Sequence, residues 1–335
     1  MIYFKAPTFW YNPQSRFFPT LLTPIEWGVT RVTEARADRH AYAWKAPIPV
    51  LCCGNMTTGG TGKTTVIIDF ARRLMLRGKT PHILTRGYKG RYTSTHFVNC
   101  ERDTAYDVGD EALLLAKYCP VWVGTDRVKT ARAAINAGAD CLLMDDGFQN
   151  PGLHKTFSLL IIDGTTGLGN GRVLPAGPLR EKANTALRRA SALLLVDEDL
   201  TDFTSYITQQ KKHILPIYQG YWQQTQEVSS LIGKTCIAFA GLGRPEKFFS
   251  GLQKAGAFLQ QTISYPDHYY YKKRDIDFLI ALAHKYNSLL VTTPKDAVRL
   301  PYFFRQQVKE IDVTLHWHNP TIPEHILDTL LGVQV

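Results

Sequence analysis

The sequence predicts an α/β protein built on a doubly wound, mostly parallel sheet, with a second, smaller α/β domain. Short apolar runs alternate with helix-like stretches, which is the order that a parallel sheet with crossover helices requires. Most of these runs are apolar throughout, as expected of strands covered on both faces. The length of 335 residues is sufficient for two domains of roughly 100–200 residues each.

The elements of the first domain are expected to alternate along the chain. Its strands are predicted at Ile48–Cys53, His82–Thr85, Val121–Gly124, Cys141–Asp146, Ser158–Asp163 and Ala192–Asp197. Its helices are predicted at Lys63–Arg77, Glu111–Lys117, Arg127–Ala137 and Lys182–Arg189. This alternation of strand and helix indicates a doubly wound α/β domain.

The pattern changes after Tyr218, where the polar and aromatic segment Gln219–Glu227 is interpreted as a linker. A second set of α/β elements follows. Its strands are predicted at Thr235–Ala240, Ser288–Thr292 and Val313–Trp317, and its helices at Pro245–Ala255 and Asp275–Tyr286. The boundary is therefore placed near Gly220, with residues 1–220 in the first domain and 221–335 in the second.

The balance of charge narrows the range of partners. Lys and Arg exceed Asp and Glu, 39 against 29, which gives a formal net charge of +10. Such a surplus suits a nucleotide, a nucleic acid or an anionic membrane surface. The chain has no dense Lys/Arg run and no nucleic-acid motif, so no nucleic acid is expected as a partner. No obligate protein partner is expected either.

Cysteines and hydropathy point to the compartment. None of the six cysteines forms a CxxC pair, and Cys52, Cys53 and Cys141 lie in apolar runs, so buried thiols in a reducing compartment are expected. The N-terminus lacks a signal-peptide pattern. No apolar run approaches the roughly 18–20 residues needed to cross a bilayer. A cytoplasmic protein is predicted, with a position on a membrane surface still open.

The strongest motif is a glycine-rich turn that follows an apolar strand and leads directly into a helix, the context of a phosphate-binding P-loop. Glycines let backbone N–H groups close around phosphate oxygens, and the helix N-terminus adds positive charge. Lys63 is expected to reach the β- and γ-phosphates of ATP, and Thr64 to bind Mg²⁺. The predicted nucleotide-binding residues are Thr57 (in place of the usual first glycine), Thr58, Gly59, Gly60, Thr61, Gly62, Lys63, Thr64 and Thr65.

A second acidic element supports the P-loop. The apolar strand from Leu142 ends in Asp145 and Asp146. P-loop proteins use such a strand to hold Mg²⁺ and its waters. Buried strands also end in Asp for structural reasons, so the inference depends on the combination with the loop. Together the two elements predict a P-loop NTPase-like domain.

The motifs favour ATP over GTP. Guanine recognition uses N-K-x-D, and the nearest segment, Pro294-Lys295-Asp296, lacks that spacing. Partition-type ATPases have a lysine where this chain has Thr58. A P-loop switch or metallochaperone-like GTPase, whose output is conformational, remains an alternative function. A cytosolic sugar or coenzyme kinase without a membrane role is another.

The N-terminal stretch permits two interpretations. The segment Phe17–Leu22 is largely apolar and contains Pro19. A helix from about Pro24 would place Ile25, Val29 and Val32 on one face, with Arg31, Arg36 and Arg39 elsewhere. Such a helix can lie on a membrane surface or pack on the core. This pattern alone favours packing on the core.

Ordered motifs along nearly the whole chain form a family resemblance. In the first domain they are Gly54-Asn55, Gly59–Thr64, Arg86-Gly87-Tyr88, Val108–Glu111, Asp145–Gln149, Gly169-Asn170-Gly171 and Leu174–Glu181. In the second they are Ala238–Gly243, Pro266-Asp267-His268 and Lys295–Val298. With these motifs the chain resembles the tetraacyldisaccharide 4'-kinases, the lipid A 4'-kinases of Gram-negative bacteria. It departs from the usual family residues at Asn150, Thr65, Arg244 and Pro294.

The resemblance implies a specific reaction and place. A tetraacyldisaccharide 4'-kinase uses ATP and Mg²⁺ to phosphorylate the 4'-hydroxyl of a lipid-linked glucosamine disaccharide 1-phosphate, giving lipid IV-A. The reaction takes place on the cytoplasmic face of the inner membrane, where the enzyme is peripheral. The resemblance therefore reverses the interpretation of Phe17–Val32, which is now expected to contact the membrane.

The resemblance also assigns catalytic roles. It implies that Asp110 is the base for the acceptor hydroxyl and that His268 is its partner. From the residues alone, Asp110 would be interpreted as a helix N-cap and His268 as a polar loop residue. Arg180 is expected either to neutralise the transferring phosphoryl group or to form a surface ion pair with Glu181. The catalytic set is Asp110, His268, Lys63 and Arg180, and the metal set is Thr64, Asp145, Asp146 and Gln149.

Overall fold

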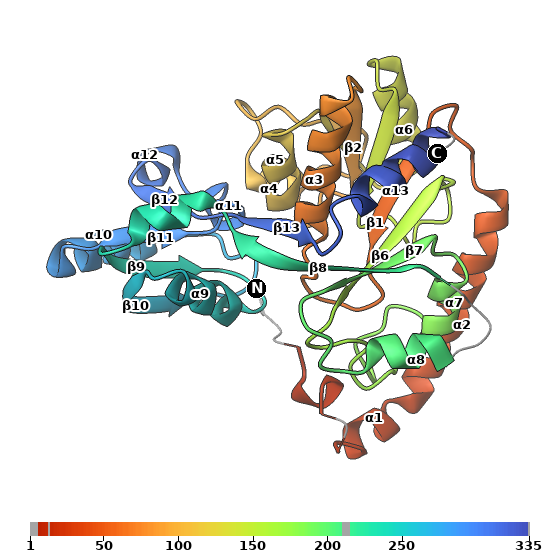
Figure 1. Ribbon diagram of the computed structural model, residues 1–335, viewed down its shortest axis with the longest axis horizontal. Coiled ribbons are helices and arrows are strands. Elements are labelled where there is room, and N and C mark those ends of the chain that lie inside the picture. Colours follow the sequence, from red (N-terminus) through yellow and green to blue (C-terminus); the bar gives the residue numbers. More distant parts are fainter. Residues whose placement is uncertain (1–5, 13, 210–214, 334–335) are drawn as a thin grey trace.

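The computed structural model describes residues 6–12, 14–209 and 215–333, which form two sheets with helices around them (Figure 1). Within these residues the large sheet has nine strands in the order β13-β8-β7-β6-β1-β5-β2-β4-β3, and the small sheet has four in the order β10-β9-β11-β12. The strands of the large sheet are β1 Val50–Gly54, β2 Pro81–Thr85, β3 His96–Phe97, β4 Val121–Val123, β5 Cys141–Asp145, β6 Phe157–Asp163, β7 Ala192–Val196, β8 Ile217–Gln224 and β13 Val313–Trp317. Those of the small sheet are β9 Thr235–Ala240, β10 Phe258–Ser264, β11 Leu289–Thr292 and β12 Val308–Glu310.

Helices cover both sheets. Those up to β8 are η1 Thr8–Trp10, α1 Phe17–Leu21, α2 Thr23–Asp38, η2 Arg39–Tyr42, α3 Lys63–Leu76, α4 Ala105–Val108, α5 Asp110–Ala116, α6 Arg127–Asn136, α7 Ala183–Leu187 and α8 Phe203–Gln209. Those after β8 are η3 Gln226–Leu231, α9 Pro245–Lys254, α10 Lys273–Tyr286, α11 Pro294–Ala297, α12 Tyr302–Arg305 and α13 Ile322–Leu331.

The predicted α/β class is confirmed. In the large sheet only the pairs β3–β4 and β8–β13 are antiparallel, and every pair in the small sheet is parallel. Successive side chains of β1 enter two different cores: Leu51 and Cys53 pack on the side of α3 and α13, and Val50 and Cys52 on the side of α6 and α7. Burial on both faces explains why the strands are apolar throughout.

The second unit differs from the predicted residues 221–335 at both ends. Strand β8 runs through Gly220 rather than ending there, and β13 returns to pair antiparallel with it in the large sheet. The C-terminal helix α13 then packs on α3, where Arg73 and Arg77 bind Glu324. The small sheet is thus an insertion between β8 and β13, both of which extend across the middle of Figure 1.

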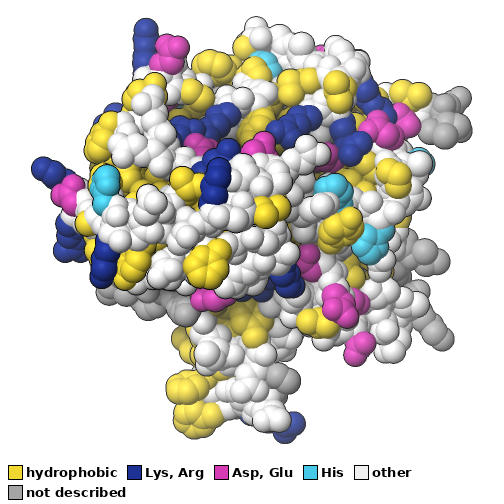
Figure 2. Space-filling model, turned by 60° about the vertical axis from the view of Figure 1, so that its left-hand side comes forward, with side chains coloured by type: hydrophobic (Ala, Val, Ile, Leu, Met, Phe, Trp, Pro, Cys, Tyr) yellow, Lys and Arg dark blue, Asp and Glu magenta, His cyan; other side chains and the backbone are white. Residues whose placement is uncertain are grey.

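The N-terminal helices lie at the side of the large sheet. Glu26 of α2 accepts hydrogen bonds from Arg172 Nε at 2.9 Å and from the Val173 backbone N–H at 2.8 Å, which attaches the helix to the loop after β6. Helix α1 forms the lowest projection of the molecule in Figure 1, and Figure 2 shows hydrophobic side chains gathered on that projection. Every helix in the described part of the chain is too short or too polar to span a bilayer.

Candidate active site

The glycine-rich loop joins the carboxyl end of β1 to the first residue of α3, Lys63. Gly59 and Gly62 have φ angles of +114° and +79°, in the left-handed region that favours glycine. A Cβ on Gly62 would lie 2.1 Å from the ring of Trp222, which comes from β8. Glycine is therefore strongly favoured at both positions. The loop leads directly into the N-terminal end of α3, where the free backbone N–H groups and the positive end of the helix dipole lie.

A proline-containing turn braces the loop and delivers an arginine to it. The Thr58 backbone N–H donates to the Pro178 carbonyl at 2.8 Å, and the Arg180 N–H donates to the Met56 carbonyl at 2.8 Å. The Arg180 guanidinium binds Asp146 Oδ1 at 2.7 Å. Backbone pairing between two segments distant in sequence thus holds the Arg180 cation beside the loop and the end of β5.

The expected alternative partner of Arg180, Glu181, points elsewhere. Glu181 is 2% exposed and pairs with Arg189. Its other oxygen accepts from Gln149 Nε2 at 3.2 Å, and the same nitrogen donates to the Asn55 carbonyl at 3.1 Å. The interpretation of Arg180 and Glu181 as a surface ion pair is therefore wrong. Gln149 supports the loop through its amide nitrogen, so any contact with a metal would use its Oε1.

The two carboxylates at the end of β5 have different surroundings. Lys63 Nζ lies 3.8 Å from Asp146 Oδ1. Burial would raise the pKa of Asp146, but Lys63 and Arg180 outweigh it and lower that pKa. Both carboxylate oxygens of Asp145 are buried without a hydrogen-bond partner among the described residues. Burial and the nearby Glu111 carboxylate raise the pKa of Asp145 to about 7.

The orphaned Asp145 carboxylate fits a hard cation. Buried polar groups are normally paired, and Thr61 Oγ1 in the adjacent loop also lacks a partner among the described residues. In the part of the chain that the structure describes, no three His, Cys, Asp or Glu side chains gather into a preassembled metal site. Mg²⁺ is usually held by one or two carboxylates with substrate phosphates and waters, so this donor set suits Mg²⁺.

A buried carboxylate–imidazole pair joins the two units. His268 Nδ1 lies 3.0 and 2.7 Å from the two carboxylate oxygens of Asp110. Asp110 and His268 are only 3% and 8% exposed. Asp110 is the first residue of α5, and Gly109 occupies the N-cap position. The interpretation of Asp110 as an N-cap is therefore wrong. His268 does lie in a loop, but it is buried and paired with Asp110.

Cations surround the pair. Arg299 Nε lies 3.5 Å from Asp110 Oδ2, and Lys295 Nζ lies 2.9 Å from Glu111 Oε1. Burial raises the pKa of Asp110, but the His268 hydrogen bond and the charges of Lys295, His268 and Arg299 lower it to about 2. Asp110 is thus held as a carboxylate at neutral pH.

Comparison with known proteins identifies the family. The family model described as Tetraacyldisaccharide-1-P 4'-kinase matches residues 18–331. The chain belongs to this family.

Relatives of this 4'-kinase family match over almost the full length. The tetraacyldisaccharide 4'-kinase of Gluconacetobacter diazotrophicus is 48% identical over 97% of this chain and 98% of its own length. That of Gluconobacter oxydans is 47% identical over 98% of both chains. A solved structure of LpxK from Aquifex aeolicus, in complex with ATP, has the same fold, with a TM-score of 0.75 and 24% identity over 94% of this chain and 100% of that chain.

In this 4'-kinase the predicted site residues form one charge network. The charges of Glu111 and Lys63 both act on the pKa of Asp145. Glu111 also forms an ion pair with Lys295, whose charge lowers the pKa of Asp110. The loop, the end of β5 and the Asp110–His268 pair therefore converge. Thr65, predicted to bind nucleotide, lies apart from them on α3 and lines a separate cavity of about 40 Å³ beside β13.

Sequence reasoning assigned no role to three residues that complete the 4'-kinase site. Glu111 and Lys295 form a partly buried ion pair between the two units, and both lie in motifs that carried the family resemblance. Trp222, which covers Gly62, was placed in a linker because its segment is polar and aromatic. The available signal for the first two was a charged residue next to an Asp in a family motif, and no signal existed for Trp222.

Proposed function

We propose that this chain transfers the γ-phosphoryl group of ATP to the 4'-hydroxyl of a tetraacylated glucosamine disaccharide 1-phosphate, giving lipid IV-A. The observation that carries the proposal is the convergence of a buried carboxylate–imidazole pair with a glycine-rich loop. Glu111, which follows Asp110, is near enough for its charge to raise the pKa of Asp145 and for the charge of Lys63 to lower its own pKa. A proton acceptor and a phosphate-binding loop would therefore share one site. The curated relatives are named Tetraacyldisaccharide 4'-kinase, which agrees with this site.

The loop is proposed to bind the triphosphate of ATP as a P-loop. Backbone N–H groups from Gly59 to Thr64 would surround its oxygens, because the Thr58 N–H already donates to Pro178 and Thr65 lies beyond the loop on α3. Lys63 would bind the β- and γ-phosphates. Arg180 lies against Asp146 beside Lys63, where its guanidinium would neutralise charge that develops on the transferring group.

Mg²⁺ is proposed to be held by Thr64, Asp145 and Asp146, with Gln149 beside them. The metal ion would supply charge neutralisation between the β- and γ-phosphates. Asp145 suits this role because its buried oxygens have no hydrogen-bond donor among the described residues and its pKa is raised by burial and by Glu111. Binding a cation would keep Asp145 ionised.

Phosphoryl transfer is proposed to use Asp110 as the base. The 4'-oxygen of the sugar forms the new bond to the γ-phosphorus, the bond to the β-phosphate oxygen breaks, and ADP leaves. The hydroxyl proton passes to the Asp110 carboxylate, and His268 holds that carboxylate in place through Nδ1. Because the two residues come from different units, the site is complete only when the units are together.

An assay of the purified chain with ATP, Mg²⁺ and the disaccharide monophosphate tests the function. ATP consumption that depends on the lipid and yields a 4'-phosphorylated product is expected. A GTPase switch would instead hydrolyse GTP without lipid, and a cytosolic sugar kinase would accept a deacylated disaccharide equally well. Either of these results would overturn the proposal.

The N-terminal segment is proposed to bind the cytoplasmic face of the inner membrane as a peripheral element. Phe17, Leu21 and Ile25 are 74%, 65% and 57% exposed, an unusual cluster of large apolar side chains for a surface in water. Glu26, one residue after Ile25 on α2, attaches the helix to the protein and leaves the Ile25 side chain exposed. A helix that is attached to the protein and still exposes an apolar side chain suits an interfacial position.

The triple replacement of Phe17, Leu21 and Ile25 by serine is expected to release the chain from vesicles. Removing three partly inserted apolar side chains, each contributing about 1.5–3 kcal/mol when fully buried, should lower partitioning by at least roughly tenfold. The apparent KM for the lipid should rise, and the KM for ATP should not. Vesicle co-sedimentation and lipid-dependent kinetics measure both effects.

A matched control removes exposed apolar side chains from elsewhere. Leu76 and Tyr302 are 88% and 77% exposed and lie outside the N-terminal segment. The Leu76→Ser/Tyr302→Ser variant is expected to bind vesicles as the unaltered chain does. If the N-terminal variant binds vesicles as strongly as the unaltered chain, the N-terminal segment packs on the protein and does not bind the membrane.

A further inference from the structure

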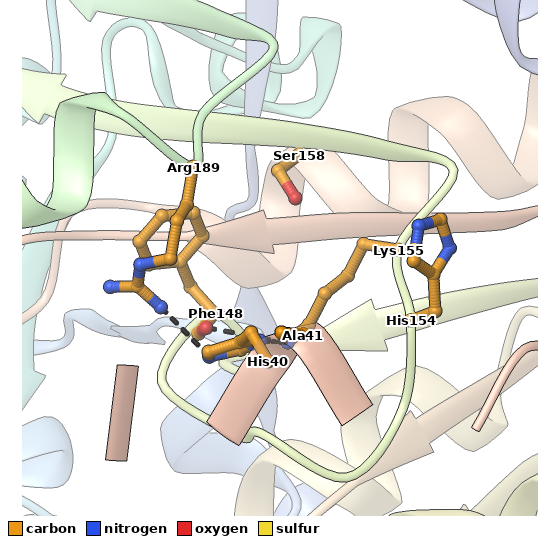
Figure 3. Close-up of a pocket in the computed structure, with 7 residues that line it drawn as sticks. All are labelled: His40, Ala41, Phe148, His154, Lys155, Ser158 and Arg189. Atoms are coloured by element: carbon orange, nitrogen blue, oxygen red, sulfur yellow. Dashed lines mark hydrogen bonds between the residues drawn. The ribbon is translucent and has the colours of Figure 1, made fainter. Parts of the chain in front are cut away.

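A cavity of about 320 Å³ lies apart from the glycine-rich loop, beneath the turn η2 that follows α2 (Figure 3). Its walls come from η2, from the connection between β5 and β6, from the start of β6 and from the segment after α7. The lining residues are His40, Ala41, Phe148, His154, Lys155, Ser158 and Arg189. A cavity lined by two cationic side chains and two imidazoles is unusual, because polar groups shielded from water normally have hydrogen-bond partners in the protein.

The hydrogen-bonding groups around His40 do not match. Its Nε2 lies 2.8 Å from Arg189 Nη1, and its Nδ1 lies 3.3 Å from Lys155 Nζ. A neutral imidazole has one acceptor nitrogen and one N–H, whereas guanidinium and ammonium groups only donate. One of the two contacts therefore places a donor against a donor. The cluster has more donors than acceptors.

The charges are also unbalanced. Arg189 pairs with Glu181, but Lys155 has no carboxylate within ion-pair distance in the described part of the chain and instead contacts the Phe148 and Asn150 carbonyls. Burial, together with the neighbouring cations, lowers the pKa of His40 to about 3. Burial lowers the pKa of Lys155 to about 8. Positive charge is thus held here at a cost in free energy that an anion would reduce.

We propose that this cavity binds a small oxyanion of the phosphate class, either inorganic phosphate or a phosphomonoester. Oxygens of the anion would accept from Lys155 and Arg189, which have the donor excess, and Ser158 and His154 line the same space. The guanidinium of Arg189 stacks on the Phe148 ring, 4.7 Å from its centroid, which fixes the direction of its N–H groups. Phosphate supplies several acceptors in one compact group, as this set of donors requires.

The cavity is connected to the glycine-rich loop. Arg189 binds Glu181, Glu181 accepts from Gln149, and Gln149 donates to the Asn55 carbonyl at the start of the loop. A test must therefore separate phosphate bound in this cavity from phosphate bound at the loop. The full-length Lys63→Ala variant is a suitable background because it lacks the principal phosphate-binding cation of the loop.

Inorganic phosphate is expected to bind this background and to raise its melting temperature, as measured by calorimetry. Adding Lys155→Gln should weaken phosphate binding at least about tenfold, because the anion would lose a charge-assisted hydrogen bond. His154→Asp should do the same by repulsion from an exposed position, where the substitution does not disturb the core. Lys129→Gln removes one positive charge from a surface side chain that is 77% exposed, and should leave the affinity unchanged.

Competition identifies the source of the anion. Displacement of phosphate by glycerol 3-phosphate would show that phosphomonoesters bind the site, and failure to displace it would restrict the site to inorganic phosphate. The proposal is overturned if Lys155→Gln and His154→Asp keep the affinity of the background. It is equally overturned if Lys129→Gln weakens binding as much as they do, since the effect would then be one of net charge.

Discussion

Replacement of Lys63 by alanine is expected to lower turnover by at least about 10²–10³-fold, the loss typical of removing one preorganised donor that stabilises developing charge. Lys63 begins α3 at the end of the glycine-rich loop, and its ammonium lies 3.8 Å from Asp146 Oδ1 with the side chain 11% exposed. The ammonium is therefore held where the γ-phosphate is proposed to bind. A neutral methyl group there leaves the transferring charge without its nearest cation.

The fold is expected to survive this change, because Lys63 is the first residue of α3 and alanine is the best helix former. Circular dichroism and thermal melting check the fold, and single-turnover phosphorylation of the disaccharide checks the chemistry. Lys129→Ala, at an exposed position on α6, is the matched control and should retain full activity. A folded Lys63→Ala variant with normal turnover would refute the assignment of the loop.

Replacement of Asp110 or His268 by alanine is expected to lower kcat by about 10²–10⁴-fold, the usual contribution of a general base. The affinity for ATP should change far less, because the proposed phosphate contacts come from the loop and Lys63. Separate measurement of kcat and of nucleotide binding tests this contrast. A large loss of ATP affinity in either variant would place the pair in nucleotide binding instead.

The double variant distinguishes a pair from two independent residues. Asp110 and His268 share two contacts of 3.0 and 2.7 Å, so removing either one disables the same unit. The double variant is expected to be no slower than roughly the slower single variant, because residues that act as a unit are non-additive. Fully multiplicative defects would show independent action.

The helix following the loop could be predicted from local sequence, but the surroundings of the loop could not. The glycines and Lys63-Thr64 are adjacent in the chain, so their order after an apolar strand was enough to predict strand, turn and helix. Trp222 covers Gly62 because its strand, β8, belongs to the same sheet as β1, and no local pattern encodes that approach. The same holds for the turn at Pro178 that braces Thr58.

The end of the chain shows why the second unit was assigned too many residues. Val313–Trp317 has the composition of a strand in any sheet, and its position after the small-sheet elements suggested that it joined them. The structure pairs it with β8 instead, and Trp317 Nε1 donates to Asp69 Oδ2 of α3 at 3.0 Å. Strand composition depends on burial, whereas strand pairing depends on which edge is available.

Local order along the chain was sufficient for the α/β class, for the glycine-rich loop and for the carboxylates at the end of β5, because each arises from neighbouring residues with one preferred backbone arrangement. The meeting of Asp110 with His268 and of Glu111 with Lys295 required the folded chain. These contacts join residues from two units whose relative position is set by β8 and β13, and charged side chains far apart in sequence carry no mark of the partner they will meet. Burial raises the pKa of Asp110, but the His268 hydrogen bond and the cations that the folded chain brings to it outweigh burial and keep it a carboxylate.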